Sequence, residues 1–468
     1  MKKIRSSSFL LVLTLASALF FSACLRSKDE VTNTTELPQI TLTFYGLFDN
    51  EDVYTPFINN YESAHPNVTI LYKKFTDPQS YLNLIVNELA EGEGPDIFML
   101  HNTWFPQEYK KLTPAPSSIL TPEVFRGNFV DVVANDLIIP DTSNIEQVWG
   151  MPLYVDTLAL YYNDAHFEDA IPAQGHPSTT WDGIKNDVTL LNRQDQSFER
   201  FERAGIALGR SDNILRSFDI LMMMMLDYKV PFYSDDLTEV TFGNDPNALK
   251  ALQLYTSFAL PSQKNYSWNK YLADADSGEK EITTFAKGKL SMLFGYSYTY
   301  SDIVNEINRL KSESIETIDT DSVKIQEAPQ AFDPSSSAET RKAYASYFAP
   351  VVSRTSRNTD VAWDFLASMS SPVNLQAYNQ ATHRPSALRS LITEEMKDPI
   401  YGIFAGQVGY AHSIPMTNSE EYKSIFMSGV DQILATASPE DVLRNLANQI
   451  QALIPSSGVK PIYVAPAE

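Results

Sequence analysis

The sequence of 468 residues contains a single cysteine, Cys24, and few basic residues for its length. One cysteine excludes an internal disulfide, so the packing of side chains has to stabilise the fold. The 36 Lys and Arg residues face 58 Asp and Glu, giving a formal net charge of −22. Such a surface repels nucleic acid and anionic lipid headgroups, so we expect no nucleic-acid partner. The sequence also lacks the G-x-S-x-G, H-E-x-x-H and P-loop motifs of three large enzyme classes.

Long apolar runs are scarce as well, and the clearest one lies at the N-terminus. Lys2, Lys3 and Arg5 precede the apolar stretch 9–21, and Ser22, Ala23 and Cys24 follow it. This order is typical of a secretory signal, and the stretch is too short for a membrane span. Removal of residues 1–23 leaves 33 basic and 58 acidic residues, a formal charge of −25.

The small residues before Cys24 resemble the lipobox of bacterial lipoproteins, with one departure. Phe21 stands where that family usually has Leu. The resemblance implies a lipid on Cys24, which anchors the chain to a membrane without a spanning helix. Residues 24–38 are polar and are expected to form a flexible tether. The alternative is cleavage by the ordinary signal peptidase, with Cys24 a spare residue.

The stretch 40–104 alternates strand and helix signals. Residues 40–45, 68–72 and 96–100 have strand patterns, and residues 50–65 and 77–91 carry apolar stripes at helical spacing. We expect a parallel sheet, in which ligands bind beyond the carboxyl ends of the strands. The loops 46–50 and 101–104 follow the first and third strands, so they form the candidate site.

Several later motifs occur in the same order as in a known family. They are the segments 94–98 (GPDIF), 151–163 (MPLYVDTLALYYN), 285–295 (FAKGKLSMLFG) and 362–365 (AWDF). With the first strand and loop, 40–50, they make the chain resemble the extracellular solute-binding proteins of ABC importers, family 1, which includes maltose-binding protein. The resemblance spans about residues 40–454.

The resemblance implies an α/β fold of the periplasmic-binding-protein type II, with two α/β lobes and a three-crossing hinge. We place the N-terminal lobe at 38–155 and 350–382, and the C-terminal lobe at 157–348 and 384–455. The crossings are expected near 155–157, 347–350 and 382–384. Carried over by position, the ligand-binding residues are Asp49, Asn50, His101, Asn102, Trp104, Asp156, Asn213, Tyr296, Tyr298 and Tyr410.

Sugars require hydrogen-bonding groups for their hydroxyls and flat apolar faces for their C–H groups, and this set supplies both. Asp49 as a helix cap and Trp104 as a core residue remain alternatives. His101 has no second histidine at helical spacing, and consecutive methionines at 222–225 point in different directions on a helix, which favours core packing. We therefore expect no metal and no cofactor.

The sequence thus predicts a monomeric, lipid-anchored binding protein facing the outside or the periplasm. It captures a sugar and delivers it to the membrane subunits of an ABC permease. A surface binding or sensory lipoprotein of the same fold is an alternative. A glycoside hydrolase that uses Asp49 and Asp156 as its carboxylate pair is another.

Overall fold

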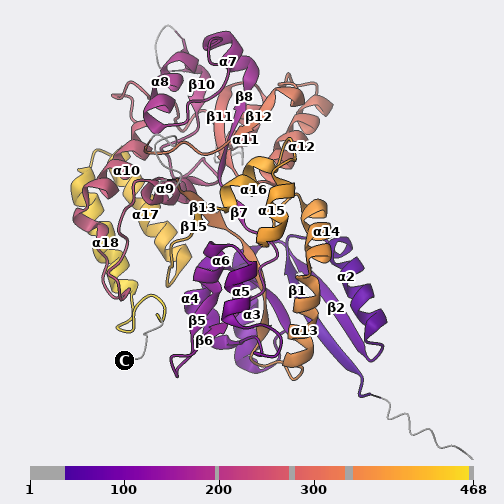
Figure 1. The fold of residues 1–468 in the computed structure, drawn as a ribbon. Helices are drawn as coiled ribbons and strands as arrows, with labels where there is room; N and C mark the ends of the chain where they lie inside the picture. The colour runs from indigo at the N-terminus through magenta and orange to yellow at the C-terminus, as the bar shows by residue number, and fades with distance from the viewer. Residues whose placement is uncertain (1–36, 196–199, 274–279, 333–340, 463–468) are drawn as a thin grey trace, which may run out of the picture. The chain divides into compact units, whose positions relative to one another are not determined.

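The computed structural model describes residues 37–195, 200–273, 280–332 and 341–462 (Figure 1). The predicted signal peptide, Cys24 and nearly all of the predicted tether lie outside these ranges. The elements below belong to one compact unit, Ile40–Glu468. Within the described ranges, no helix combines the length and the apolarity needed to cross a bilayer.

The first sheet confirms the alternation predicted from the sequence. β1 (Ile40–Leu47) pairs in parallel with β2 (Val68–Phe75) on one side and with β3 (Ile97–His101) on the other. The strand order is β2-β1-β3-β14-β4, where β14 (Phe348–Ser353) runs antiparallel to β3 and pairs with β4 (Leu112–Thr113). A strand from the last third of the chain therefore completes a sheet that the N-terminal strands begin.

Local sequence sets the ends of the crossover helices α2 (Glu51–Ala64) and α3 (Pro78–Glu91). The Asp77 carboxylate accepts a hydrogen bond from the Ser80 amide at 2.9 Å, Pro78 occupies the first turn, and Gly92 ends α3 with φ 78°. These are the capping roles that the residue types favour. Asn50 precedes α2, but its side chain makes no capping bond.

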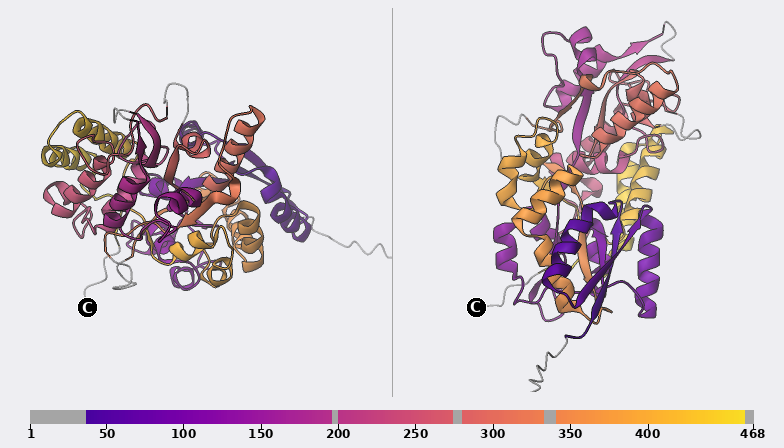
Figure 2. Two further views of the ribbon diagram at one scale, coloured as in Figure 1. Left: turned by 90° about the horizontal axis from the view of Figure 1, so that it is seen from above. Right: turned by 90° about the vertical axis from the view of Figure 1, so that its right-hand side faces the viewer.

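The first lobe is built around what we call the first core, which includes Leu42, Phe44, Leu100, Trp363 and Phe365. Helices α2, α13 (Thr359–Met369) and α14 (Pro372–Thr382) pack against one another on this lobe, as the labels of Figure 1 and the further views of Figure 2 let the reader follow. The remaining elements that contribute to this core or flank it are η1 (Asn102–Trp104), α4 (Phe105–Glu108), η2 (Tyr109–Lys111), α5 (Pro122–Asn128), α6 (Asp131–Leu137), β5 (Ile138–Pro140), β6 (Glu146–Val148), α13 (Thr359–Met369), α14 (Pro372–Thr382) and α15 (Arg389–Glu395).

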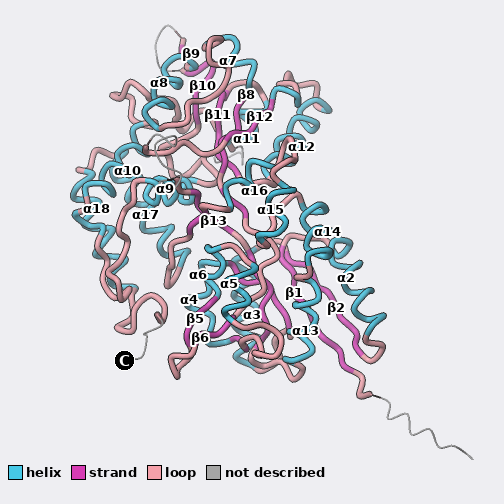
Figure 3. The backbone as a smooth tube through the Cα atoms, viewed as in Figure 1, coloured by secondary structure: helices cyan, strands magenta, loops and turns pink. Residues whose placement is uncertain are grey.

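The second lobe has its own sheet, of order β12-β8-β11-β10-β9 (Figure 3). β11 (Leu290–Gly295) runs parallel to β10 (Phe201–Ile206) and antiparallel to β8 (Ala159–Asn163). β12 (Val323–Gln326) and β9 (Arg193–Gln194) form its edges. The other elements of this lobe are α7 (Asp164–Ala170), α8 (Trp181–Leu191), α9 (Ser217–Asp227), η3 (Phe242–Asn244), α10 (Pro246–Ser257), α11 (Glu281–Ala286), α12 (Thr299–Ser312), η4 (Thr320–Ser322), α16 (Gly402–Val408), α17 (Ser419–Leu434) and α18 (Pro439–Leu453).

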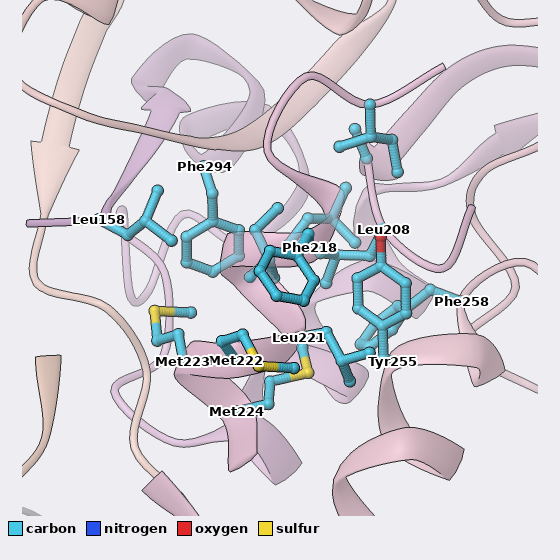
Figure 4. Close-up of a cluster of buried hydrophobic side chains, with 14 of the residues drawn as sticks. Leu158, Leu208, Phe218, Leu221, Met222, Met223, Met224, Tyr255, Phe258 and Phe294 are labelled. Carbon is cyan, nitrogen blue, oxygen red and sulfur yellow. The ribbon is translucent and has the colours of Figure 1, made fainter. Parts of the chain in front are cut away.

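The second core contains Leu158, Leu208, Tyr255, Phe258 and the α9 side chains around them (Figure 4). All four methionines at 222–225 are at most 1% exposed. The expectation that they pack in a core is confirmed. Flexible thioether side chains fill the irregular space between α9 and its neighbours.

The chain passes between the two cores beside a small sheet of order β15-β13-β7. Its strands are β7 (Asp156–Thr157), β13 (Ala343–Ser346) and β15 (Ala411–His412). At three places the chain changes from one core to the other. Val155, Ala345 and Ile392 pack with the first core, and Leu158, Tyr344 and Tyr401 pack with the second. By this packing the second change of core lies just before the stretch 347–350 expected from the sequence, and the third lies beyond 382–384. Val408 and Ala411 again belong to the first core. The lobe boundaries expected from the sequence stay a prediction.

Candidate functional site

A cavity of about 480 Å³ is lined by residues from both cores and from the passages between them, and we call it the interlobe cavity. Five of the predicted binding residues line it, namely His101, Trp104, Asp156, Tyr296 and Tyr298. The loops after β1 and β3 therefore converge on one site, as the strand order predicts. The lining also includes Phe48, Thr103, Tyr154, Arg216, Phe218, Asp219, Tyr344, Ser346, Phe348, Arg384, Glu420 and Lys423.

Aromatic rings from the first lobe form one wall of the interlobe cavity. The Phe348 ring lies 4.8 Å from the His101 ring, 5.6 Å from Trp104 and 5.8 Å from Phe48, each in an edge-to-face arrangement. Trp104 is only 8% exposed and belongs to the first core, whereas Phe48 is 42% exposed. Trp104 therefore both fills the core and lines the cavity, and Phe48 offers the more accessible ring.

Phe48 also has a strained backbone, with φ 70°. A non-glycine residue in the left-handed region costs about 1 kcal/mol or more, and such strain is found at binding sites. This conformation turns the chain out of β1 and leaves the Phe48 ring beside Phe348.

A Phe48→Gly variant is expected to bind the ligand of the interlobe cavity about tenfold more weakly, because it removes an aromatic face. Its free energy of unfolding should stay within about 1 kcal/mol of the wild type, since the relieved backbone strain offsets the lost ring contact. Ligand titration and urea denaturation measure the two quantities. Ser314→Gly, at another strained position with φ 59° far along the second lobe, is the matched control. Equal affinity in wild type and Phe48→Gly would contradict a role of this ring.

Arg216 and Asp219 bring charge to the opposite wall, at the start of α9. The Arg216 guanidinium lies over the rings of Tyr296 and Tyr298, 5.3 and 5.5 Å from their centroids, and donates to the Tyr298 hydroxyl. The Tyr296 hydroxyl donates to Asp219 at 3.0 Å. Burial raises the pKa of Asp219, and Arg216 opposes that rise. This wall therefore presents a cation, an acid and two stacked tyrosines.

His101 is neutral in this site. Burial, together with the positive charge of Arg216, lowers the pKa of His101 to about 3. Its Nδ1 and Nε2 lie 2.8 Å from Thr103 Oγ1 and 3.0 Å from Ser346 Oγ, so one nitrogen donates and the other accepts. These bonds hold the imidazole ring against Phe348.

Asp156 lines the interlobe cavity, but its carboxylate is already held by the second lobe. It accepts hydrogen bonds from the Ser297 hydroxyl at 2.7 Å, from the Ser297 amide at 3.1 Å and from the Thr157 amide at 2.9 Å. Burial raises the pKa of Asp156 to about 6, and these bonds limit the rise. Asp156 therefore fixes the first passage between the lobes to the Tyr296–Tyr298 loop.

The raised pKa of Asp156 predicts that the stability of the fold depends on pH, and an Asp156→Asn variant isolates this contribution. The folded state keeps the Asp156 proton at a pH where the unfolded chain, with a pKa of about 3.9, has lost it. The stabilisation is complete below the unfolded pKa and is lost as the pH rises through about 6. The stability of the wild type relative to Asp156→Asn should fall by about 1.4 kcal/mol per pH unit in this window. Urea titrations across the window measure it.

Asp182→Asn is the control for that titration, because Asp182 has an exposed side chain paired with Lys185 in the same lobe. Its free energy of unfolding should stay within about 1 kcal/mol of the wild type, because exposed ion pairs contribute little. A flat pH profile for Asp156→Asn relative to the wild type would show that the Asp156 proton does not couple to folding.

Asp49, predicted as a ligand contact, is buried behind the cavity and positions Arg384 instead. Its carboxylate accepts hydrogen bonds from Arg384 Nη1 at 2.9 Å, from the Tyr378 hydroxyl at 2.8 Å and from the Tyr54 hydroxyl at 3.2 Å. The Arg384 guanidinium lies 4.6 Å from the centroid of the Tyr154 ring. Asp49 thus presents Arg384 to the cavity.

Four further predicted residues lie away from the cavity lining. Asn50 is exposed and accepts from Lys74 at 2.6 Å. Asn102 donates to the buried Asp136 at 3.4 Å, and Tyr410 lies under the Arg341 guanidinium. Asn213 is fully buried and bonded to Trp268 and to two backbone carbonyls. These residues were predicted because they follow strands or lie near the crossings between lobes. Such positions do not tell a side chain that lines the cavity from one that points elsewhere.

Four residues that line the interlobe cavity were not predicted from the sequence, namely Arg216, Asp219, Phe348 and Arg384. For Arg216 the sequence did contain an indication of such a role. A cation at a helix N-terminus opposes the helix dipole, so an arginine directly before the apolar α9 needs a local reason. Its stacking on Tyr296 and Tyr298 supplies that reason.

Comparisons with known proteins agree with this architecture. The family model described as bacterial extracellular solute-binding protein matches residues 57–400. No curated protein sequence matches the chain. Among solved structures, the sugar-binding protein MalE of Xanthomonas citri has a TM-score of 0.71 at 14% identity, covering 88% of this chain and 97% of that one.

Two further structures show the same fold. An ABC substrate-binding protein of Listeria monocytogenes in complex with cycloalternan has a TM-score of 0.65 at 15% identity, covering 88% and 98% of the two chains. The GacH receptor of Streptomyces glaucescens, solved unliganded and with acarbose, has a TM-score of 0.66 at 16% identity, covering 89% and 99%. Because the family model spans well over half of the chain, this protein belongs to the bacterial extracellular solute-binding proteins, and its two α/β lobes have the type II binding-protein fold.

Proposed function

We propose that this protein captures a carbohydrate in the interlobe cavity and delivers it to the membrane subunits of an ABC importer. The observation that carries the proposal is a cavity lined from both lobes. It has aromatic faces on one wall, and Arg216 and Asp219 on the other. Sugars need this combination of flat apolar faces and charged hydrogen-bonding groups. The volume of about 480 Å³ lies within the range of small-molecule sites.

The ligands of similar structures, cycloalternan and acarbose, set the sugar panel to be tested. At 15% and 16% identity these structures establish the fold, so the sugar class rests on the lining of the interlobe cavity. Binding between lobes supplies a signal to the importer, because a ligand that contacts both lobes stabilises the closed arrangement.

The hydrolase alternative is less well supported by the geometry. Asp49 lies behind the cavity in an ion pair with Arg384, and the Asp156 carboxylate accepts three hydrogen bonds from Thr157 and Ser297. Neither carboxylate is placed as a free acid or base on opposite sides of a bound sugar. We therefore propose a binding protein and not an enzyme. Hydrolysis of an aryl glycoside by the wild type, lost in Asp156→Asn, would reverse this conclusion.

Calorimetry over a panel of maltose, maltotriose, cycloalternan and acarbose tests the ligand class, with small-angle scattering in parallel. We expect saturable heat with at least one sugar, together with a smaller radius of gyration and a monomeric mass. No heat and no compaction with any sugar would refute the carbohydrate proposal. An importer permease gene beside this one would favour transport over a surface sensory role.

The membrane anchor is a separate proposal that rests on the sequence around Cys24. We expect the mature chain to carry a lipid on Cys24 and to face the outside or the periplasm. Labelled palmitate should enter the protein in cells that express the full chain, and Cys24→Ser should abolish the label. A labelled Cys24→Ser protein, or an unlabelled wild type, would refute the anchor without affecting the ligand proposal.

A further inference from the structure

The described chain continues beyond α18 as the segment 454–462, which we call the C-terminal strap and which is yellow in Figure 1. α18 belongs to the second lobe, because its apolar face packs in the second core. The contacts of the strap begin on that lobe and end on α6 of the first lobe. The strap therefore joins the two lobes at a place outside the three passages of the hinge, and no residue of it lines the interlobe cavity.

The strap is bound to the second lobe through the turn 234–237, between α9 and η3. The Val459 amide donates to the Leu237 carbonyl at 3.0 Å, and Val459 is 3% exposed. Gly458 turns the chain with φ 86°. A Cβ atom at Gly458 would lie 3.1 Å from the Asp236 carbonyl oxygen and 3.2 Å from that of Leu237, closer than ordinary van der Waals contact. The left-handed turn and the close approach both require glycine here.

Lys460, the next residue, carries the strap to the first lobe. Its ammonium donates to the Asn135 carbonyl at 2.5 Å. Asn135 lies in the last turn of α6, where backbone carbonyls have no partner within the helix. A cation at this end also complements the negative end of the helix dipole. Lys460 thus supplies a donor and a charge that the end of α6 favours.

Asp136 adds a negative charge beside this position. Its buried carboxylate accepts from the Tyr347 hydroxyl at 2.8 Å and from the Ser413 hydroxyl. Burial raises the pKa of Asp136, and the positive charge of Lys460 opposes that rise. Tyr347 follows the second change of core and Ser413 follows β15, so Lys460 approaches the first lobe on the side of the hinge passages.

We propose that the C-terminal strap holds the two lobes in the arrangement of this structure, with Lys460 released from Asn135 when they separate. The connection has little slack, because Val459 is fixed to the second lobe and the adjacent Lys460 side chain alone spans to the first. A contact made in one arrangement and lost in the other shifts the equilibrium between them, with or without a ligand. The strap thereby sets how often the unliganded cavity is open. This proposal does not depend on which solute the cavity binds.

Pulsed electron paramagnetic resonance on the unliganded, full-length chain in detergent measures this equilibrium. Spin labels are placed on Gln79→Cys in α3 and Ser424→Cys in α17, and Cys24→Ser leaves no other thiol. Both labelled residues are exposed, and each follows a residue that lines the interlobe cavity, Pro78 and Lys423. The separation of the two labels therefore reports how far the lobes are apart across the cavity.

In Lys460→Met we expect a population whose label separation is larger by about 2 Å or more, about threefold more abundant than in the labelled parent. Lys460→Arg keeps a cationic donor and should retain the distribution of the parent. Lys397→Met removes a lysine from an exposed pair with Glu394 and is the matched control. Its label separation should not change.

Gly458→Val frees the other end of the strap, because a side chain there overlaps with the carbonyls of the turn 234–237. It should increase the open population as Lys460→Met does, and the double variant should add nothing further, since both act on one strap. Gly175→Val is the control, at a left-handed glycine of the second lobe where an added Cβ meets no atom within 4 Å.

An unchanged separation in both Lys460→Met and Gly458→Val would overturn the strap, and so would an equal increase in Gly175→Val or Lys397→Met. Urea denaturation distinguishes a purely structural role. We expect the unfolding midpoint of Lys460→Met to match that of the parent, because the bond to Asn135 joins lobes that each keep their own core. A lowered midpoint with an unchanged label separation would assign Lys460 to stability alone and overturn the proposal.

Discussion

Arg384→Met is expected to lower the free energy of unfolding by about 3 to 5 kcal/mol, because it leaves the Asp49 carboxylate buried without its cation. The two side chains are 12% and 7% exposed and lie 2.9 Å apart. The Tyr54 and Tyr378 hydroxyls would remain as donors but carry no charge. Urea denaturation, followed by the fluorescence of the aromatic first core, measures the change.

Arg389→Met is the matched control, since Arg389 also pairs with an aspartate, Asp131, but at the surface. Exposed pairs contribute at most about 1 kcal/mol, so this variant should be nearly as stable as the wild type. The double variant Asp49→Asn with Arg384→Met should recover part of the loss, because the uncompensated charge is gone. If the two methionine variants were equally stable, Asp49 and Arg384 would not form a buried pair in solution.

The same pair shows why part of the site was hidden in the sequence. Asp49 follows β1, and an acid in that loop was a reasonable ligand contact. Its actual partners, Tyr378 and Arg384, are more than 300 residues away and approach only when α14 packs on α2. Sequence patterns report local conformation well, but they do not say which distant side chain neutralises a buried charge.

The elements that local sequence determines were predictable. Apolar periodicity predicts β1, β2, β3, α2 and α3, and Asp77, Pro78 and Gly92 mark the two ends of α3. The convergence of the loops after β1 and β3 then follows from parallel pairing, which is why His101 and Trp104 line the cavity. The insertion of β14 beside β3 depends on contacts about 250 residues apart, and no local pattern encodes them.

Asn213 illustrates the opposite error, in which a polar residue near a strand end serves the core. Its Nδ2 donates to the carbonyls of Asn269 and Ala273 at 2.9 and 3.0 Å, and its Oδ1 accepts from Trp268 Nε1 at 2.8 Å. With 0% exposure, the Asn213 amide joins these three groups without itself contacting solvent. A hydrogen-bonding side chain in a loop can bind a ligand or other groups of the protein, and the partners of Asn213 are groups of the protein.

Asn213→Leu is therefore expected to lower the free energy of unfolding by about 3 to 5 kcal/mol, because it removes three buried hydrogen bonds at once. Asn213→Asp should not rescue it, since a carboxylate accepts from Trp268 but faces the two carbonyl oxygens without donors. Ser211→Ala, at a half-buried position of the same loop where the hydroxyl donates to Asp431, should lower the free energy of unfolding by about 1 kcal/mol or less. Urea denaturation ranks the variants, and sugar titration at a temperature where all remain folded completes the test.

An Asn213→Asp protein of wild-type stability with lost sugar affinity would return Asn213 to the binding site. We expect the reverse for Asn213→Asp, a lower free energy of unfolding with unchanged sugar affinity of the folded protein, because the three hydrogen bonds of Asn213 stabilise the fold.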